Sequence, residues 1–183
     1  KRARYYVDGI PLVTPSVRRV PHWAISPRAK THNYINMVLA DLEVRASNPS
    51  AWALLLDERG NVAEGQGCNV FVVKDGMLLT PKEQYVLAGV TRSVIIELAG
   101  SLNIPFKEAD IDLYDAYTSQ EVFFTSTSLC VCPVSSINGN ILANEGVTGP
   151  VTLRLQRAFS DLVGMDVRDQ YLTHLQEGDP RPF

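Results

Sequence analysis

The sequence has no long apolar run and no excess of positive charge. No apolar stretch reaches the ~18 residues that a membrane span needs. The 183 residues include 17 lysines and arginines against 20 aspartates and glutamates, which gives a formal net charge of −3. Nucleic-acid-binding domains usually carry a basic patch. We therefore expect no membrane segment and no nucleic-acid partner.

Cysteine is also scarce. The three cysteines, Cys68, Cys130 and Cys132, are too few and too odd in number for a disulfide framework. Disulfide-poor chains are typical of reducing compartments, so we expect a cytoplasmic protein. No second pair completes a zinc site around Cys130 and Cys132, and we expect no metal.

The glycine-rich loops of the common nucleotide-binding folds are absent. A phosphate group is also well held by the N–H groups of a helix N-terminus. Gly89-Val90-Thr91 open a stretch with helical spacing, and Thr125-Ser126-Thr127 follow an apolar stretch. These two clusters of donors can form a phosphate site, and the missing glycine-rich loops mean that its ligand would not be a typical nucleotide. Without a ligand, Thr91 is a plain helix cap and the second cluster a polar loop.

The chain does contain short apolar strands interspersed with helical stretches. A chain of this length forms one domain of ordinary size. We therefore predict an α/β domain with a mixed, curved sheet. Helices are expected at residues 33–46, 91–102, 113–117 and 150–163. Strands are expected as a pair around an Asp8-Gly9 turn within residues 5–13, and at 16–20, 51–56, 62–64, 69–73, 77–79, 121–124 and 130–137.

Lys30 is the first candidate for chemistry. A lysine amine attacks an aldehyde only when it is neutral, so it must be desolvated or lie near other positive charge. Ile25, Ala29 and Ile35 are close in sequence and offer apolar surroundings. Most lysines are instead solvated surface charges, and Lys30 alone does not decide between the two.

Five segments follow one another in an order that is more informative than any of them alone. They are Lys30-Thr31-His32-Asn33-Tyr34; Val62-Ala63-Glu64-Gly65 with Asn69-Val70-Phe71; Leu87-Ala88-Gly89-Val90-Thr91-Arg92; Glu121-Val122-Phe123-Phe124-Thr125-Ser126-Thr127; and Gly149-Pro150-Val151-Thr152. In order and spacing, this set resembles the pyridoxal-phosphate enzymes of fold type IV, from about residue 17 to about residue 159. These are the class IV aminotransferases, which include branched-chain, D-amino-acid and (R)-selective amine transaminases and the aminodeoxychorismate lyases.

The resemblance implies pyridoxal 5′-phosphate as the cofactor and a role for Lys30, Glu64 and Tyr34. Lys30 would bond to the cofactor's aldehyde. Glu64 would contact the ring nitrogen and keep it protonated, so that the ring acts as an electron sink. Tyr34 would lie near the ring hydroxyl or the substrate, although branched-chain enzymes have one extra residue before this tyrosine. Without the family pattern, Glu64 is an ordinary strand-end glutamate beside a turn.

Five further residues complete the expected cofactor site. By resemblance, Thr127 contacts the phosphate and Leu87 packs against the ring face. Val90 and Thr91 would supply N–H groups, with the Thr91 hydroxyl, and Ser126 belongs to the second donor cluster. Asn69 is expected to be structural. We interpret Arg18-Arg19 as part of an edge strand with one solvated arginine.

The resemblance also implies the architecture and the partners. Residues 1–183 would form one domain, the large C-terminal domain of fold type IV, with a mixed curved sheet (pseudo-barrel) and flanking helices. Residues 1–20 would serve as interdomain linker or edge strands. The family's smaller N-terminal domain precedes the matched segment, and this chain begins at Lys1, so we expect the C-terminal part of a longer enzyme. A homodimer acting on amino acids and 2-oxo acids follows.

The substrate class is drawn from the same segments. Gly149-Pro150-Val151-Thr152 resembles branched-chain aminotransferases, which we favour. Val17-Arg18-Arg19 with Ser26-Pro27-Arg28 resembles the (R)-selective amine group, and Thr125-Ser126-Thr127 resembles the D-amino-acid group. An aminodeoxychorismate lyase and a pyridoxal-phosphate-binding fragment without catalysis are the remaining alternatives.

Overall fold

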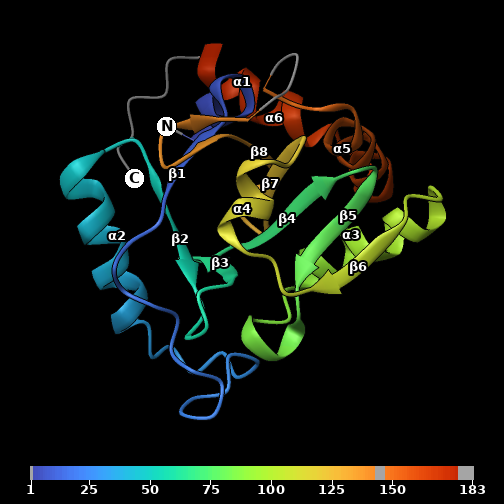
Figure 1. The fold of residues 1–183 in the computed structure, drawn as a ribbon. Coiled ribbons are helices and arrows are strands. Elements are labelled where there is room, and N and C mark those ends of the chain that lie inside the picture. Colours follow the sequence, from blue (N-terminus) through green and yellow to red (C-terminus); the bar gives the residue numbers. More distant parts are fainter. Residues whose placement is uncertain (1, 143–146, 177–183) are drawn as a thin grey trace.

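Six strands close into a barrel at the centre of the computed structural model, which describes residues 2–142 and 147–176. Their order around the barrel is β3-β2-β1-β8-β7-β4, and β4 pairs with β3 to complete the circle (Figure 1). The predicted mixed, curved sheet is thus confirmed. The six strands are β1 (Ile10–Val13), β2 (Trp52–Leu56), β3 (Val62–Gly65), β4 (Asn69–Lys74), β7 (Glu121–Ser126) and β8 (Cys130–Ile137).

The sheet is mixed because β1 runs parallel to both of its neighbours, β2 and β8, whereas the other barrel pairs are antiparallel. The second half of β4 leaves β3 and pairs with β5 (Met77–Pro81), which pairs in parallel with β6 (Phe106–Ala109). A two-residue strand, β9 (Asn140–Ile141), pairs with β8. The first half of β4 therefore lies at the mouth of the barrel, next to the turn from β3.

The strands are buried on both faces, which explains their unbroken apolar runs. Along β4, Val70 and Val72 point into the core that fills the barrel, while Phe71 and Val73 face a second core outside it. Strand β7 alternates in the same way. A third core lies between β2 and the buried face of α2.

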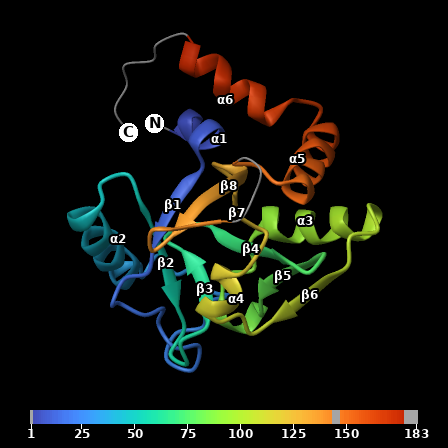
Figure 2. The ribbon, with the colours of Figure 1, turned by 45° about the horizontal axis from the view of Figure 1, so that its top comes forward.

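Helices cover the barrel on opposite sides (Figure 2). Helix α2 (Ile35–Ser47) packs against β2, while α3 (Val90–Ser101) and α5 (Pro150–Val163) cover the outer core on the other side. The remaining helices are η1 (Arg2–Arg4), α1 (Tyr5–Asp8), η2 (Glu83–Tyr85), α4 (Leu113–Tyr117) and α6 (Val167–Gln176). None of the helices in the described ranges is long and apolar enough to cross a membrane.

The prediction of two strands within residues 5–13 is wrong. Tyr5–Asp8 is a helical turn that ends at Gly9, where φ is +72° and a side chain would collide with Ser135. The hydroxyl of Tyr6 donates to the Leu129 carbonyl, and tertiary contacts of this kind outweigh the strand propensity of tyrosine. The only strand in this segment, β1, is paired on both sides, so it is not the expected edge strand.

Residues 16–20 also form no strand. Only the Arg19 amide of this segment joins the β2 end, through a 2.8 Å hydrogen bond to the Leu56 carbonyl. The other expected helices and strands are present with bounds that differ by at most two residues. Strand β6 and helix α6 were not predicted.

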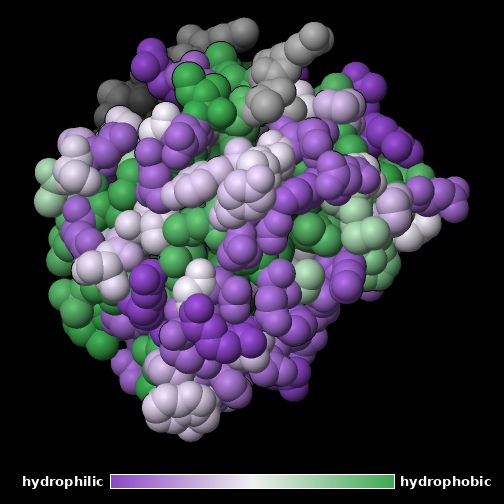
Figure 3. Space-filling view, in the orientation of Figure 1, coloured by the Kyte–Doolittle hydropathy of each residue, from purple (hydrophilic) through white to green (hydrophobic). Residues whose placement is uncertain are grey.

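An apolar stripe runs along the outer face of α2. Ile35, Val38, Leu39 and Leu42 recur at helical spacing and remain 41–64% exposed. Figure 3 shows apolar side chains gathered on the left, over this helix. Helix α2 is thus apolar on two sides, and the part of the chain that the structure describes covers one of them.

Candidate active site

A cavity of about 570 Å³ opens at one end of the barrel. Its walls are the loop that carries Lys30, the turn from β3 to β4, the segment that leads into α3, and the end of β7. The structure brings all eight predicted site residues to this cavity: Lys30, Tyr34, Glu64, Leu87, Val90, Thr91, Ser126 and Thr127. Their roles toward a ligand stay predictions.

Glu64 is the buried carboxylate of the cavity. It lies at the end of β3 with 3% of its surface exposed. Its Oε1 accepts a 2.6 Å hydrogen bond from Arg19 Nε, and its Oε2 accepts a 3.0 Å hydrogen bond from the Leu87 amide. Burial raises the pKa of Glu64, since a charged carboxylate loses its hydration. The charge and hydrogen bond of Arg19 and the Leu87 amide oppose this rise.

Arg19 is a site residue that we did not expect. Only Arg18 of the pair is solvated, and Arg19 is 9% exposed and lines the cavity. A buried guanidinium needs an acceptor, and for Arg19 this acceptor is the carboxylate of Glu64, 45 residues further along the chain. The Arg-Arg pair ahead of Lys30 was the only signal for it in the sequence.

Asn69 connects the floor of the cavity to the segment before α3. Its amide nitrogen donates to the Leu87 carbonyl at 2.8 Å and approaches Glu64 Oε2 at 3.5 Å. Asn69 thus has the structural contact that we expected, and this contact joins two parts of the chain that are 18 residues apart. Leu87 is fixed through both its N–H and its carbonyl, which holds its side chain at the cavity wall.

The N-terminus of α3 faces the cavity with free donors. Gly89 is its N-cap and offers no side chain, and Val90 and Thr91 line the cavity. Within the described residues, no protein group accepts from the Val90 or Thr91 amide. Thr125 adds a hydroxyl that is buried, unpaired and part of the cavity wall. This end of the cavity is therefore suited to an anion with several oxygens.

Lys30 and Tyr34 also line the cavity and are exposed to solvent. Of the three named apolar neighbours of Lys30, Ala29 and Ile35 are also exposed and Ile25 is partly buried, so the prediction of an apolar environment for the Lys30 amine is wrong. Tyr34 is 38% exposed and directly precedes α2. The lysine lies at the rim of the cavity, whereas Glu64 lies in its floor.

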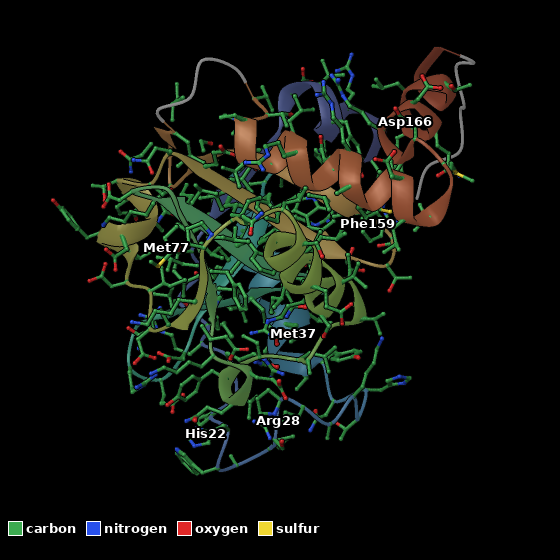
Figure 4. The ribbon with its side chains drawn as sticks, turned by 90° about the vertical axis from the view of Figure 1, so that its right-hand side faces the viewer. His22, Arg28, Met37, Met77, Phe159 and Asp166 are labelled. Carbon is green, nitrogen blue, oxygen red and sulfur yellow. The ribbon has the colours of Figure 1, made fainter. Side chains whose placement is uncertain are left out.

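Polar contacts attach the Lys30 loop to the body of the protein. His22 packs edge-on against Tyr85 and lies 3.5 Å from Glu58, and Arg28 lies 3.4 Å from Glu83. Figure 4 shows His22 and Arg28 at the end of the molecule away from Phe159 and Asp166. Partly or fully exposed groups thus connect this loop to the segments around Glu58 and Glu83.

The segment Gly149-Pro150-Val151-Thr152 lies outside the cavity. The buried carboxylate of Glu121 accepts from the Val151 amide at 2.9 Å and from the Thr152 amide at 2.7 Å. It also accepts from the Thr152 hydroxyl at 2.6 Å. This helix N-terminus is therefore filled by the protein's own carboxylate, unlike that of α3.

The three cysteines are free, and Cys68 and Cys132 are buried. Across residues 2–142 and 147–176, no group of three or more histidine, cysteine, aspartate and glutamate side chains is placed to hold a metal ion.

The sequence model of the amino-transferase class IV family matches residues 1–137, about three quarters of the chain. The chain belongs to the class IV aminotransferase family. It is 41% identical over 156 residues to a putative branched-chain-amino-acid aminotransferase of Methanocaldococcus jannaschii, a match that covers 85% of this chain and 54% of the relative. A branched-chain-amino-acid aminotransferase of Pseudomonas aeruginosa is 40% identical over 158 residues, with 85% and 50% covered.

Solved structures agree with the fold. The branched-chain aminotransferase of Escherichia coli superposes with a TM-score of 0.83 at 36% identity, covering 87% of this chain and 53% of that one. The branched-chain aminotransferase of Thermobaculum terrenum, crystallised in its pyridoxal-phosphate form, gives a TM-score of 0.80 at 32% identity, with 93% and 56% covered. The class IV aminotransferase fold is thus confirmed, and the chain spans about half the length of the curated relatives that it matches.

Proposed function

We propose that this chain is the cofactor-binding part of a pyridoxal-phosphate-dependent aminotransferase of the branched-chain type. One observation carries the proposal. In a member of this family, a rim lysine, a buried carboxylate and a helix N-terminus with free donors converge on one cavity of about 570 Å³. Similarity to enzymes that are named branched-chain aminotransferases supports the substrate class.

The residues present fit the cofactor on their own chemistry. The α3 amides of Val90 and Thr91 and the unpaired hydroxyl of Thr125 suit a phosphate. A side chain at Gly89 would collide with Asn69 Oδ1, so the backbone here approaches its neighbour closely. Glu64 supplies the carboxylate that a protonated ring nitrogen requires.

Bound pyridoxal phosphate supplies an aldehyde for an amine and a ring that withdraws electrons from the substrate's α-carbon. The protein then has three tasks. Glu64 holds a proton at the ring nitrogen. Leu87, held through its backbone N–H and its carbonyl, would support the ring face. Lys30, as a free amine, would take a proton from the α-carbon of the amino donor and pass it to the cofactor carbon that carried the aldehyde.

The partners follow from the same proposal. An amino acid donates the amino group and a 2-oxo acid receives it. We also propose a homodimer, which the exposed apolar stripe of α2 supports. A cytoplasmic location stays a prediction.

Visible absorbance during titration with pyridoxal phosphate tests the proposal. We expect a band near ~410–430 nm that borohydride fixes and peptide mapping assigns to Lys30. The Lys30→Ala variant should lack the fixed adduct. Lys107→Ala is the matched control, because Lys107 is an exposed lysine on β6 away from the cavity. Adduct at other lysines with equal yield would contradict the proposal.

The substrate class is tested on the loaded chain. Loss of the band on adding L-leucine or L-valine, with release of the matching 2-oxo acid, is expected. A response to D-alanine or an (R)-amine instead would indicate the other transaminases. Pyruvate released from aminodeoxychorismate would indicate the lyase. A loaded chain that responds to none of them would be a binding domain without catalysis.

A further inference from the structure

Among the residues that the structure describes, one cation contacts the carboxylate of Glu64 directly, and it comes from the segment leading to Lys30. Arg19 Nε lies 2.6 Å from Glu64 Oε1, and their side chains are 10% and 4% exposed. The Arg19 backbone is fixed independently by its hydrogen bond to the Leu56 carbonyl. The guanidinium is therefore delivered to Glu64 by a backbone that is anchored to the end of β2.

We propose that Arg19 is a positioning residue of the proposed reaction: it keeps the buried Glu64 carboxylate ionised and oriented, so that Glu64 can hold a proton at the cofactor's ring nitrogen. The proposal rests on the proposed function and assigns a role to a residue outside the expected lysine, glutamate and phosphate-binding set.

The physical argument begins with the cost of burying a charge. A carboxylate that loses its hydration takes up a proton unless cations or hydrogen-bond donors compensate. A protonated Glu64 would compete for the proton that the ring nitrogen needs. Arg19 compensates with a full charge and a short, charge-assisted hydrogen bond, whereas the Leu87 amide contributes only a neutral donor.

The other groups around Glu64 do not replace Arg19. Arg92 is 2% exposed and its charge also lowers the pKa of Glu64, but it makes no hydrogen bond to Glu64, and its Nη2 is engaged by Glu108 and by the Pro81 carbonyl, both at 3.0 Å. Asn69 offers a neutral amide at 3.5 Å. Cys68 supplies no positive charge either, because burial raises the pKa of its thiol and keeps it neutral. Lys30 lines the same cavity but is exposed, and it makes no ion pair with Glu64 among the described residues.

The test compares Arg19→Met with Arg18→Met. The two arginines are adjacent, but Arg18 is exposed and its side chain makes no contact with Glu64. In the unloaded protein, ¹³C NMR of labelled glutamate side chains, with Glu64→Gln for assignment, reports the charge of Glu64. We expect Glu64 to move toward its protonated signal at neutral pH in Arg19→Met and to stay unchanged in Arg18→Met.

The loaded protein gives the second reading. In Arg19→Met, Glu64 loses its charged hydrogen bond. The affinity for pyridoxal phosphate, measured by absorbance titration, should therefore fall about 10- to 100-fold. The absorbance of the bound cofactor should also become sensitive to pH near neutrality. Arg19→Lys, which keeps the charge, should recover part of both effects. If Arg19→Met does not fold, Arg19→Gln, which keeps a neutral donor, provides the same comparison.

The outcomes separate the two proposals. Equal cofactor binding by wild type and the neutral Arg19 variants, or an ionised Glu64 in those variants, would overturn the role of Arg19 alone. A wild-type chain that binds no pyridoxal phosphate would overturn the proposed function, and the role of Arg19 with it. Protonated Glu64 with weakened binding in the Arg19 variants, and neither effect in Arg18→Met, would establish the role.

Discussion

The side-chain oxygen of Asn69 occupies the space that a Cβ atom at Gly89 would need. Asn69 begins β4, and Gly89 caps α3. The same amide group also donates to the Leu87 carbonyl at 2.8 Å. The position of the α3 N-terminus relative to Glu64 therefore depends on a residue without a side chain.

This relationship predicts the effect of Gly89→Ala. The new methyl group must displace Asn69 or shift the first turn of α3, and either change moves the Val90 and Thr91 amides. We expect an affinity for pyridoxal phosphate about tenfold lower and a free energy of unfolding about 1–2 kcal/mol lower. Absorbance titration and urea denaturation measure the two effects.

Gly100→Ala is the matched control for this change. Gly100 lies in the same helix, and a Cβ there meets nothing within 4 Å. Alanine should therefore stabilise the helix by about 0.5–1 kcal/mol and leave cofactor affinity unchanged. Equal cofactor affinity in the Gly89 and Gly100 variants would show that the α3 N-terminus does not bind the phosphate.

Glu121→Ala should destabilise the fold without touching the cavity. Glu121 is 2% exposed and accepts three hydrogen bonds from Val151 and Thr152 at the start of α5. Removing it leaves buried donors unpaired at a helix N-terminus, so we expect a loss of about 2–4 kcal/mol in the free energy of unfolding. Urea denaturation measures this loss. Glu97→Ala, at an exposed position of α3, should change stability by less than about 0.5 kcal/mol.

Strands and helices with a strong apolar pattern were predictable from the sequence. Val70 to Val73 are apolar without a break because both faces of β4 are covered, and α5 begins at Pro150 as the preference of proline for the first helical turn suggests. Strand β6 gave little signal, because Phe106 and Lys107 are exposed and the strand pairs only with β5. Tyr5 and Tyr6 suggested a strand, but their partners, Trp52 and Leu129, are distant in sequence.

The candidate site was predictable where its residues belong to the five sequence segments that follow one another in the family's order. All eight expected residues line the cavity, which the order of the segments implied. The place of Arg19 in the site was missed because its contact with Glu64, 45 residues further on, does not show in the local sequence. The environment of Lys30 was misjudged because apolar residues that are adjacent to it in the sequence do not pack around it in this exposed loop.

The thiols should differ in reactivity in the native protein. Burial raises the pKa of Cys68 and of Cys132, and it also raises that of Cys130, which is only partly buried. We expect Ellman's reagent at mildly alkaline pH to modify Cys130 slowly and the other two only after unfolding, because the thiolate is the reactive form. The Cys130→Ser variant should lose the native-state reaction. Rapid modification of two or more thiols would contradict the buried positions of Cys68 and Cys132.

Glu108 should make stability depend on pH below neutrality. Burial acts to raise the pKa of Glu108, but the hydrogen bond from the Glu83 amide and the ion pair with Arg92 outweigh it, so the folded pKa lies below the ordinary value. A depressed carboxyl pKa contributes stability above the unfolded pKa of about 4.3, and this contribution is lost as the pH falls through the folded pKa.

Glu108→Gln should therefore be less stable than wild type at neutral pH, on the order of 1 kcal/mol, because the side chain of Glu108 is partly exposed and screened. The difference should shrink between about pH 5 and about pH 3, since the wild type loses the same charge there. Urea denaturation of both proteins across this range measures it, with Glu97→Gln as a control at an exposed position. A difference that stays constant to the acid end of this range would mean that the Glu108 charge does not stabilise Arg92.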